Sequence, residues 1–313
     1  MKVLLFTHSQ DIDGIGNIII GGKAFANLDF IPCKTFEITQ KVAEVIENKI
    51  IHNYDAIFVT DLCIKEPLLT KIYQDESLKN KILILDHHKS EIDEGNDKYS
   101  FVNIVVENGV GKTSGTSLFY EYLVSNNFLE RTTVLDEFVE LTRQYDTWEW
   151  QTKYHNPKAR KLHILMEELG YEKYIEIMQP ILETQTTIEF PKEIEDVITT
   201  FDEKLKKSTE QILEKMKIYQ ENIMGVPYKI GFITIPYKYR NEFSEIIMKN
   251  NKHDIDTIGM IMTDIDTVSY RKVKDIDVSK IGVHFGGKGH KSAASNPKKN
   301  PKFVKVLKKI QYE

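Results

Sequence analysis

The sequence predicts an α/β protein, with a parallel sheet in its N-terminal half and a smaller α/β domain at its C-terminal end. Through residues 1–150, short apolar runs alternate with stretches of helical periodicity, which is the pattern of βαβ units. The apolar runs carry hydrophobic residues at successive positions, as strands covered on both faces do. A charged stretch from Pro191 to about Ile223 has no further Gly or Pro, and it predicts a helix that connects the two parts.

The elements of the first half follow the chain in order. A first domain is expected at 1–190. Its apolar runs predict strands at Val3–Thr7, Ala56–Val59 and Lys81–Leu85. Helical spacing predicts helices at 14–26, 40–48, 66–73, 113–124 and 134–145.

The second half is expected to comprise the connecting helix at 191–225 and a second domain at 226–313. The strands predicted there are 228–235, 257–262 and 267–271, with a helix at 241–250 between the first two.

The composition excludes several classes of protein. The 313 residues are 41% hydrophobic, enough to bury a core, and no apolar run approaches the length of a membrane span. The start MKVLLFTHSQDIDG has too short an apolar stretch for a secretory signal. Cys33 and Cys63 are the only cysteines, which excludes a disulfide scaffold and a cysteine-rich zinc site. A globular protein of the cytoplasm is therefore expected, without a membrane partner.

The charge is distributed unevenly along the chain. The net charge is −5, yet residues 278–312 hold nine lysines and no acidic residue. A net acidic protein is not a general binder of duplex DNA, whereas a local basic surface can capture a small anionic substrate. The alternative is a solvated helix face, because Phe303, Val306, Leu307 and Ile310 have helical spacing with lysines between them.

Acidic residues and histidines follow the predicted strands of the first domain. Because active sites of open parallel sheets form beyond the carboxyl ends of the strands, these side chains are expected to converge. A single Asp after a strand is usually a turn or helix cap, but Asp-His-His directly after a buried strand favours metal ligation or catalysis. The candidates are His8, Asp11, Asp13, Asp61, Asp86, His87, His88 and, after a predicted helix, Asp146.

The types of side chain among these candidates narrow the choice of metal ion. Imidazole and carboxylate without thiolate disfavour a structural zinc site and suit manganese, magnesium, cobalt or a catalytic zinc ion. Several carboxylates balance the charge of two divalent ions, and two ions about 3.5–4 Å apart are a common clamp for phosphoryl displacement.

Five motifs together resemble the DHH phosphoesterases, in the subgroup with a DHHA1 C-terminal domain. The resemblance covers nearly the whole chain, and its third and last motifs are the specific ones. The motifs are THSQDIDGIG (Thr7–Gly16), VTDL (Val59–Leu62), LDHHKS (Leu85–Ser90), YDTW (Tyr145–Trp148) and SYRKVKDIDVSKIGVHFGGKGHKSAAS (Ser269–Ser295).

The resemblance implies two manganese sites, with magnesium or cobalt as other ions of the same chemistry. His8 and Asp11 would bind one ion, and Asp61 would bridge the two. The ligands of the second ion would be Asp13, His87 and Asp146.

The resemblance also implies roles around these ions. His88 would face the substrate phosphate or the bridging water, and Asp86 would orient the histidines. In the second domain, Arg271 and His290 would hold a distal phosphate or sugar of the substrate. The N–H groups of Gly286, Gly287 and Gly289 would form an anion nest. Lys288 would either contact a phosphate or point to solvent.

The expected function is that of a nanoRNase-type exonuclease, which hydrolyses short oligonucleotides to mononucleotides with a metal-activated water. Alternatives with the same metal centre are a 3′-phosphoadenosine 5′-phosphate phosphatase and a phosphodiesterase for linear or cyclic dinucleotides. A nucleotide-binding sensor without turnover is the alternative of another class. The expected partners are short single-stranded RNA or DNA, or small nucleotides, and a homodimer is compatible with the family.

Overall fold

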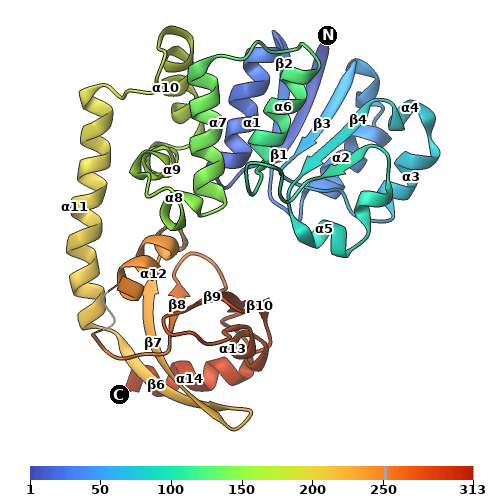
Figure 1. Ribbon diagram of the computed structural model, residues 1–313. Coiled ribbons are helices and arrows are strands. Elements are labelled where there is room, and N and C mark those ends of the chain that lie inside the picture. The colour runs from blue at the N-terminus through green and yellow to red at the C-terminus, as the bar shows by residue number, and fades with distance from the viewer. Residues whose placement is uncertain (250–251, 313) are drawn as a thin grey trace. The chain divides into compact units, whose positions relative to one another are not determined.

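The computed structural model describes residues 1–249 and 252–312, and these form two compact units, residues 1–201 and 202–313. The first unit contains a five-stranded sheet in which every strand is parallel to its neighbours (Figure 1). The strand order is β2-β1-β3-β4-β5. The strands are β1 (Lys2–His8), β2 (Asn27–Cys33), β3 (Ala56–Thr60), β4 (Ile82–Asp86) and β5 (Val102–Ile104).

The helices of the first unit cover both faces of its sheet. On one side, apolar residues of α2 (Ile38–Glu47) and α3 (Leu68–Gln74) pack against Leu4 of β1 and Val59 of β3. On the other side, α1 (Ile12–Ala24) contacts β1 and α6 (Gly115–Ser125). The ring centroids of Phe119 in α6 and Phe58 in β3 are 5.1 Å apart. This double cover explains why the central strands read as unbroken apolar runs.

The helices that follow the strands in sequence are α1 (Ile12–Ala24), α2 (Ile38–Glu47), α3 (Leu68–Gln74), α4 (Glu76–Lys79) and α5 (Lys89–Asp93), with 3-10 turns at Ile50–Asn53 and Asn96–Lys98. The helices after β5 are α6 (Gly115–Ser125), α7 (Thr133–Asp146), α8 (Glu149–Thr152), α9 (Pro157–Leu169), α10 (Tyr171–Thr184) and α11 (Lys192–Glu214).

The second unit contains a six-stranded mixed sheet in the order β10-β11-β9-β8-β7-β6, in which only β7 and β8 are parallel. Its strands are β6 (Lys217–Ile223), β7 (Val226–Ile235), β8 (Thr257–Met262), β9 (Val268–Lys272), β10 (Lys288–His290) and β11 (Ala293–Asn296). Its helices are α12 (Arg240–Lys249), α13 (Ser279–His284) and α14 (Pro301–Tyr312), with a 3-10 turn at Tyr237–Tyr239.

The connecting helix is shorter than the sequence predicted. It is α11 and ends at Glu214, whereas Lys217–Ile223 forms β6 and pairs antiparallel with β7. The expected helix over 191–225 is therefore wrong at its C-terminal end, because pairing with β7 overrides the helical pattern of this charged segment. Residue 250, at the end of the predicted helix 241–250, lies outside the described residues. Within the described ranges, no helix combines the length and apolar character that a membrane crossing requires.

Candidate active site

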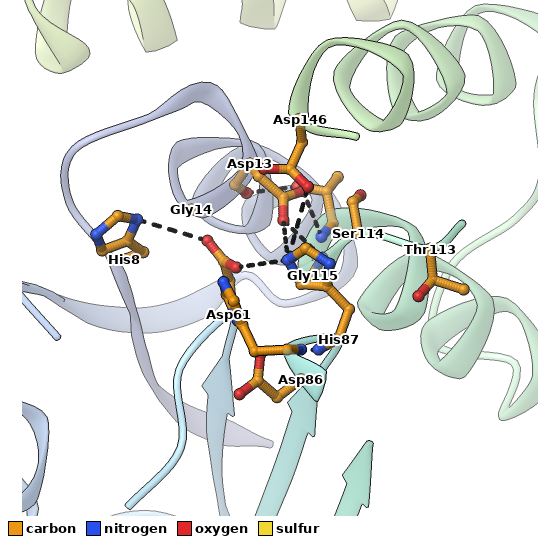
Figure 2. Close-up of polar contacts among 12 residues, drawn as sticks. His8, Asp13, Gly14, Asp61, Asp86, His87, Thr113, Ser114, Gly115 and Asp146 are labelled. Atoms are coloured by element: carbon orange, nitrogen blue, oxygen red, sulfur yellow. Dashed lines mark hydrogen bonds and ion pairs between the residues drawn. The ribbon is translucent and has the colours of Figure 1, made fainter. Parts of the chain in front are cut away.

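The polar side chains predicted at the strand ends meet at the carboxyl edge of the first sheet (Figure 2). They form three groups in which one potential ligand atom of each member lies within 4.8 Å of the others, and the groups share members. The first is His8, Asp11 and Asp61, the second is Asp13, His87 and Asp146, and the third is Asp61, Asp86, His87 and His88.

The first group is built by the turn from β1 to α1. His8 ends β1, and Asp11 is the N-cap of α1, where its Oδ1 accepts the N–H of Gly14 at 3.0 Å. The other oxygen of Asp11 lies 2.7 Å from Nδ1 of His8, and Oδ2 of Asp61 lies 3.7 Å from the same nitrogen. Helix capping therefore fixes one carboxylate oxygen and leaves the other aimed at the imidazole.

The second group surrounds Nε2 of His87. This nitrogen is 3.6 Å from Oδ2 of Asp146, the last residue of α7, and 3.8 Å from Oδ2 of Asp13. Oδ1 of Asp61 lies 3.2 Å from it. Asp61 thus directs one oxygen toward His8 and the other toward His87, between the two groups (Figure 2).

The N-terminus of α6 holds Asp13 in place, which the sequence did not reveal. The backbone N–H groups of Gly115 and Thr116 donate to the two oxygens of Asp13 at 2.6 and 2.9 Å. The helix predicted over 113–124 begins at Gly115, and Ser114 is its N-cap, within a capping box. Asp13, which accepts the N–H groups of Gly115 and Thr116, lies about a hundred residues before them, so no local pattern reveals the contact.

Gly115 also leaves space for the central carboxylate. Asp61 has a left-handed backbone, with a φ of 57°, and its N–H donates to the carbonyl of Leu85. A Cβ atom added to Gly115 would lie 2.4 Å from the Cβ of Asp61. Glycine is therefore required here by close packing against Asp61.

The electrostatics of the cluster favour a bound cation. Burial and the neighbouring carboxylates of Asp13 and Asp11 raise the pKa of Asp61 well above its ordinary value. Burial and the charge of Asp13 raise the pKa of Asp146 to about 7. Carboxylates that repel one another when ionised are stabilised together by divalent ions, so the oxygen and imidazole donors fit hard or borderline metals.

His88 and Asp86 form a separate pair beside these groups. Nδ1 of His88 is 2.7 Å from Oδ1 of Asp86, which also accepts the N–H of His87 at 2.8 Å. Burial opposes protonation of His88, but the hydrogen bond and charge of Asp86 raise its pKa to about 9. This pKa favours the charged form of the half-exposed imidazole at neutral pH in the metal-free protein.

In the second unit, Arg271 of β9 is largely enclosed. Its Nη1 donates to the hydroxyl of Ser269 at 2.8 Å and to the carbonyl of Tyr270 at 3.0 Å. Burial, and next the charge of Arg240, lower its pKa to about 10. Among the ion pairs of residues 1–249 and 252–312, none supplies a carboxylate to Arg271. A guanidinium in this environment suits an anionic ligand.

Lys288 and His290 lie on the short strand β10 and are exposed. Ala293 of β11 pairs with both His290 and Arg271, so the structure brings the predicted arginine and histidine to the two strands that flank β11.

Packing accounts for the glycines before and within β10. The N–H groups of Gly286 and Gly287 donate to the carbonyls of Val283 and Gly282, so they are not available for the expected anion nest. A Cβ atom on Gly287 would lie 1.8 Å from the carbonyl oxygen of Ser295, and one on Gly289 would lie 2.3 Å from a backbone atom of Ala294. The close approach of strand and turn requires these residues.

Comparison with known proteins identifies the family. No family model matches the sequence. The chain is 31% identical over 293 residues to oligoribonuclease NrnB of Bacillus subtilis, across 93% of this chain and 71% of the relative.

Solved structures share the fold at low sequence identity. The DHH domain of a protein described as a member of a family of ribosomal proteins has a TM-score of 0.55 and 14% identity, over 100% of this chain and 86% of that one. The pGpG-specific phosphodiesterase PggH of Vibrio cholerae has a TM-score of 0.54 and 11% identity, over 100% and 99%. Exonuclease RecJ bound to manganese has a TM-score of 0.51 and 12% identity, over 99% and 89%. The chain therefore belongs to the DHH/DHHA1 family of phosphoesterases, and it is a hydrolase.

Proposed function

We propose that this protein is a metal-dependent phosphodiesterase that hydrolyses short oligonucleotides to mononucleotides. The observation that carries the proposal is the position of Asp61, whose two oxygens face two separate groups of metal-binding side chains. The relative NrnB, which is named an oligoribonuclease, supports the substrate class.

Each residue of the cluster receives a role in this proposal. His8 and Asp11 would hold one divalent ion, and Asp61, which directs an oxygen toward each group, would contribute to both ions. When bound, the two ions lower the pKa of a water molecule and neutralise charge on the phosphate. Manganese is the proposed ion, with magnesium or cobalt as chemical equivalents. The ligands of the second ion would be Asp13, His87 and Asp146.

His88 and Asp86 act on the substrate side of the cluster. The protonated imidazole of His88 contacts the scissile phosphate and supplies a proton to the leaving oxygen. Asp86, buried at the end of β4, holds that imidazole through Nδ1 and keeps it charged. The pair contributes a general acid that is present at neutral pH.

The second domain, which the sequence places at 226–313, is proposed to bind the substrate, while residues 1–190 carry the catalytic centre. Arg271 and His290 hold a phosphate of the oligonucleotide away from the scissile bond. The absence of a carboxylate partner for Arg271, among the described ion pairs, supports this role.

A substrate panel with manganese, with and without a chelator, tests the proposal. It contains labelled RNA of two, five and many nucleotides, 3′-phosphoadenosine 5′-phosphate and a cyclic dinucleotide. Chelator-sensitive decay of the short RNAs to mononucleotides supports the proposal. If only the phosphoadenosine or the cyclic dinucleotide is hydrolysed, the proposed metal centre stands and the proposed substrate is wrong. Binding without any turnover would favour a nucleotide sensor.

A further inference from the structure

Three strands of the second unit present two rows of polar side chains. Cross-strand pairing places Arg271 of β9, Ala293 of β11 and His290 of β10 side by side. Directly opposed residues of antiparallel strands point to the same face of a sheet. Two residues further along, the same pairing gives a second row: Ser269, Ser295 and Lys288.

The opposite face of these strands is already buried. Tyr270 and Ala294, which alternate with the residues of the two rows, belong to a core with Phe285 and Phe303. Phe303 lies on α14, and α13 contacts β10 and β11 (Figure 1). The two rows therefore lie on the side of the sheet away from α13 and α14.

The first row fits one phosphate group. Neighbouring strands are about 4.8 Å apart, so the Cα atoms of Arg271 and His290 are separated by about 10 Å, with the small side chain of Ala293 between them. A long guanidinium and an imidazole can converge over that alanine on a common anion.

The second row has the components of another anion site. The hydroxyl of Ser269, which is 6% exposed, accepts a hydrogen bond from Arg271 and fixes that guanidinium beside the row. Ser295 is half-buried, and Lys288 is exposed without an acidic partner among the ion pairs of the described residues. Two residues along a strand span about 7 Å. This step resembles that between successive phosphates of an extended oligonucleotide.

We propose that Lys288 and Ser295 form a second phosphate subsite next to Arg271 and His290. The proposal rests on the proposed function and specifies its substrate class, namely oligonucleotides that carry two phosphates besides the scissile one. A 5′-phosphorylated trinucleotide would fill both rows, whereas a 5′-phosphorylated dinucleotide would fill only the first. The subsite therefore makes the protein prefer the longer of these two substrates.

Steady-state kinetics of the full chain with both substrates and manganese test this subsite. The wild type is expected to have the lower KM for the trinucleotide. Lys288→Ala should raise the KM for the trinucleotide about three- to fivefold, the size expected of one exposed ion pair, and leave the dinucleotide unchanged. Lys288→Arg should retain the preference, and Lys288→Glu should reverse it.

Lys305→Ala is the matched control, since Lys305 is exposed on α14, at the other face of the sheet. It should leave both KM values unchanged. An unaltered trinucleotide preference in Lys288→Ala, or equal losses for both substrates, would overturn the proposal. If the wild type hydrolyses neither substrate, the proposed function fails, and calorimetric titration with the two oligonucleotides still decides the subsite: tighter trinucleotide binding that depends on Lys288 supports it, and equal binding rejects it.

Discussion

Replacement of the central carboxylate, Asp61→Asn, is the most informative change at the proposed metal centre. The side chain is 3% exposed, and its oxygens lie 3.7 Å from His8 and 3.2 Å from His87. Asn has nearly the same volume and tolerates the left-handed backbone that Asp61 adopts, so the fold is expected to persist. The variant removes only the charge that would join two ions.

Two quantities should change in this variant. Turnover is expected to fall by more than about 100-fold. Removal of a residue that only hydrogen-bonds to a metal ligand already lowers metal affinity or activity about 10–100-fold. Manganese should stabilise the wild type by about 2.7 kcal/mol per site at a concentration of 100 Kd, and this gain should diminish in the variant. Without metal the variant should be at least as stable as the wild type at pH 8, since burial and neighbouring carboxylates disfavour ionised Asp61.

Thermal unfolding with and without manganese, together with hydrolysis of an RNA dinucleotide, measures these effects. Asp254→Asn is the matched control, because Asp254 also has a left-handed backbone, with a φ of 49°, but is exposed in the second unit. Near-normal turnover and undiminished manganese stabilisation in Asp61→Asn would refute the bridging role.

Three further predictions concern the second unit, the packing of the site and its pH dependence. Arg271→Ala should raise KM more than it lowers kcat, and an unchanged KM would remove this residue from the substrate site. Gly115→Ala should destabilise the fold by about 1–3 kcal/mol through overpacking against Asp61, whereas Gly22→Ala, where a Cβ meets nothing within 4 Å, should not. Equal effects of the two substitutions on the melting temperature would contradict this prediction. The raised pKa of His88, about 9, implies stability that is full below its ordinary value of 6.5 and lost as pH rises through 9. Asp86→Asn should therefore move the alkaline limb of kcat to lower pH, and an unmoved limb would exclude His88 as the proton donor.

The central strands of the first sheet were predictable because both of their faces are buried. β1, β3 and β4 are apolar on both faces, and the α/β architecture with a second sheet domain is confirmed. β2 was not predicted, since this edge strand is largely exposed and contains Asp29 and Pro32. The segment that contains β6 has a helical pattern, and the strand was not predictable because its pairing with β7 is a tertiary contact.

The candidate site was predictable where chemistry coincides with strand ends. Parallel strands bring their carboxyl ends to one edge, so widely separated residues such as His8 and Asp61 could be grouped from the sequence. The support of Asp13 by the N-terminus of α6 could not be, because nothing local marks it. The structure does not support an anion nest at Gly286 and Gly287 for a similar reason, since their N–H groups donate to carbonyls of α13.

The two-ion centre is tested most directly by anomalous diffraction from crystals of the protein grown with manganese. The account predicts two peaks on either side of Asp61, one within reach of His8 and Asp11 and one within reach of Asp13, His87 and Asp146. Two peaks in wild-type crystals that are weakened in Asp61→Asn crystals would support the bridge. A single peak, or manganese held only elsewhere, would contradict the two-ion centre and the hydrolysis that is proposed to depend on it.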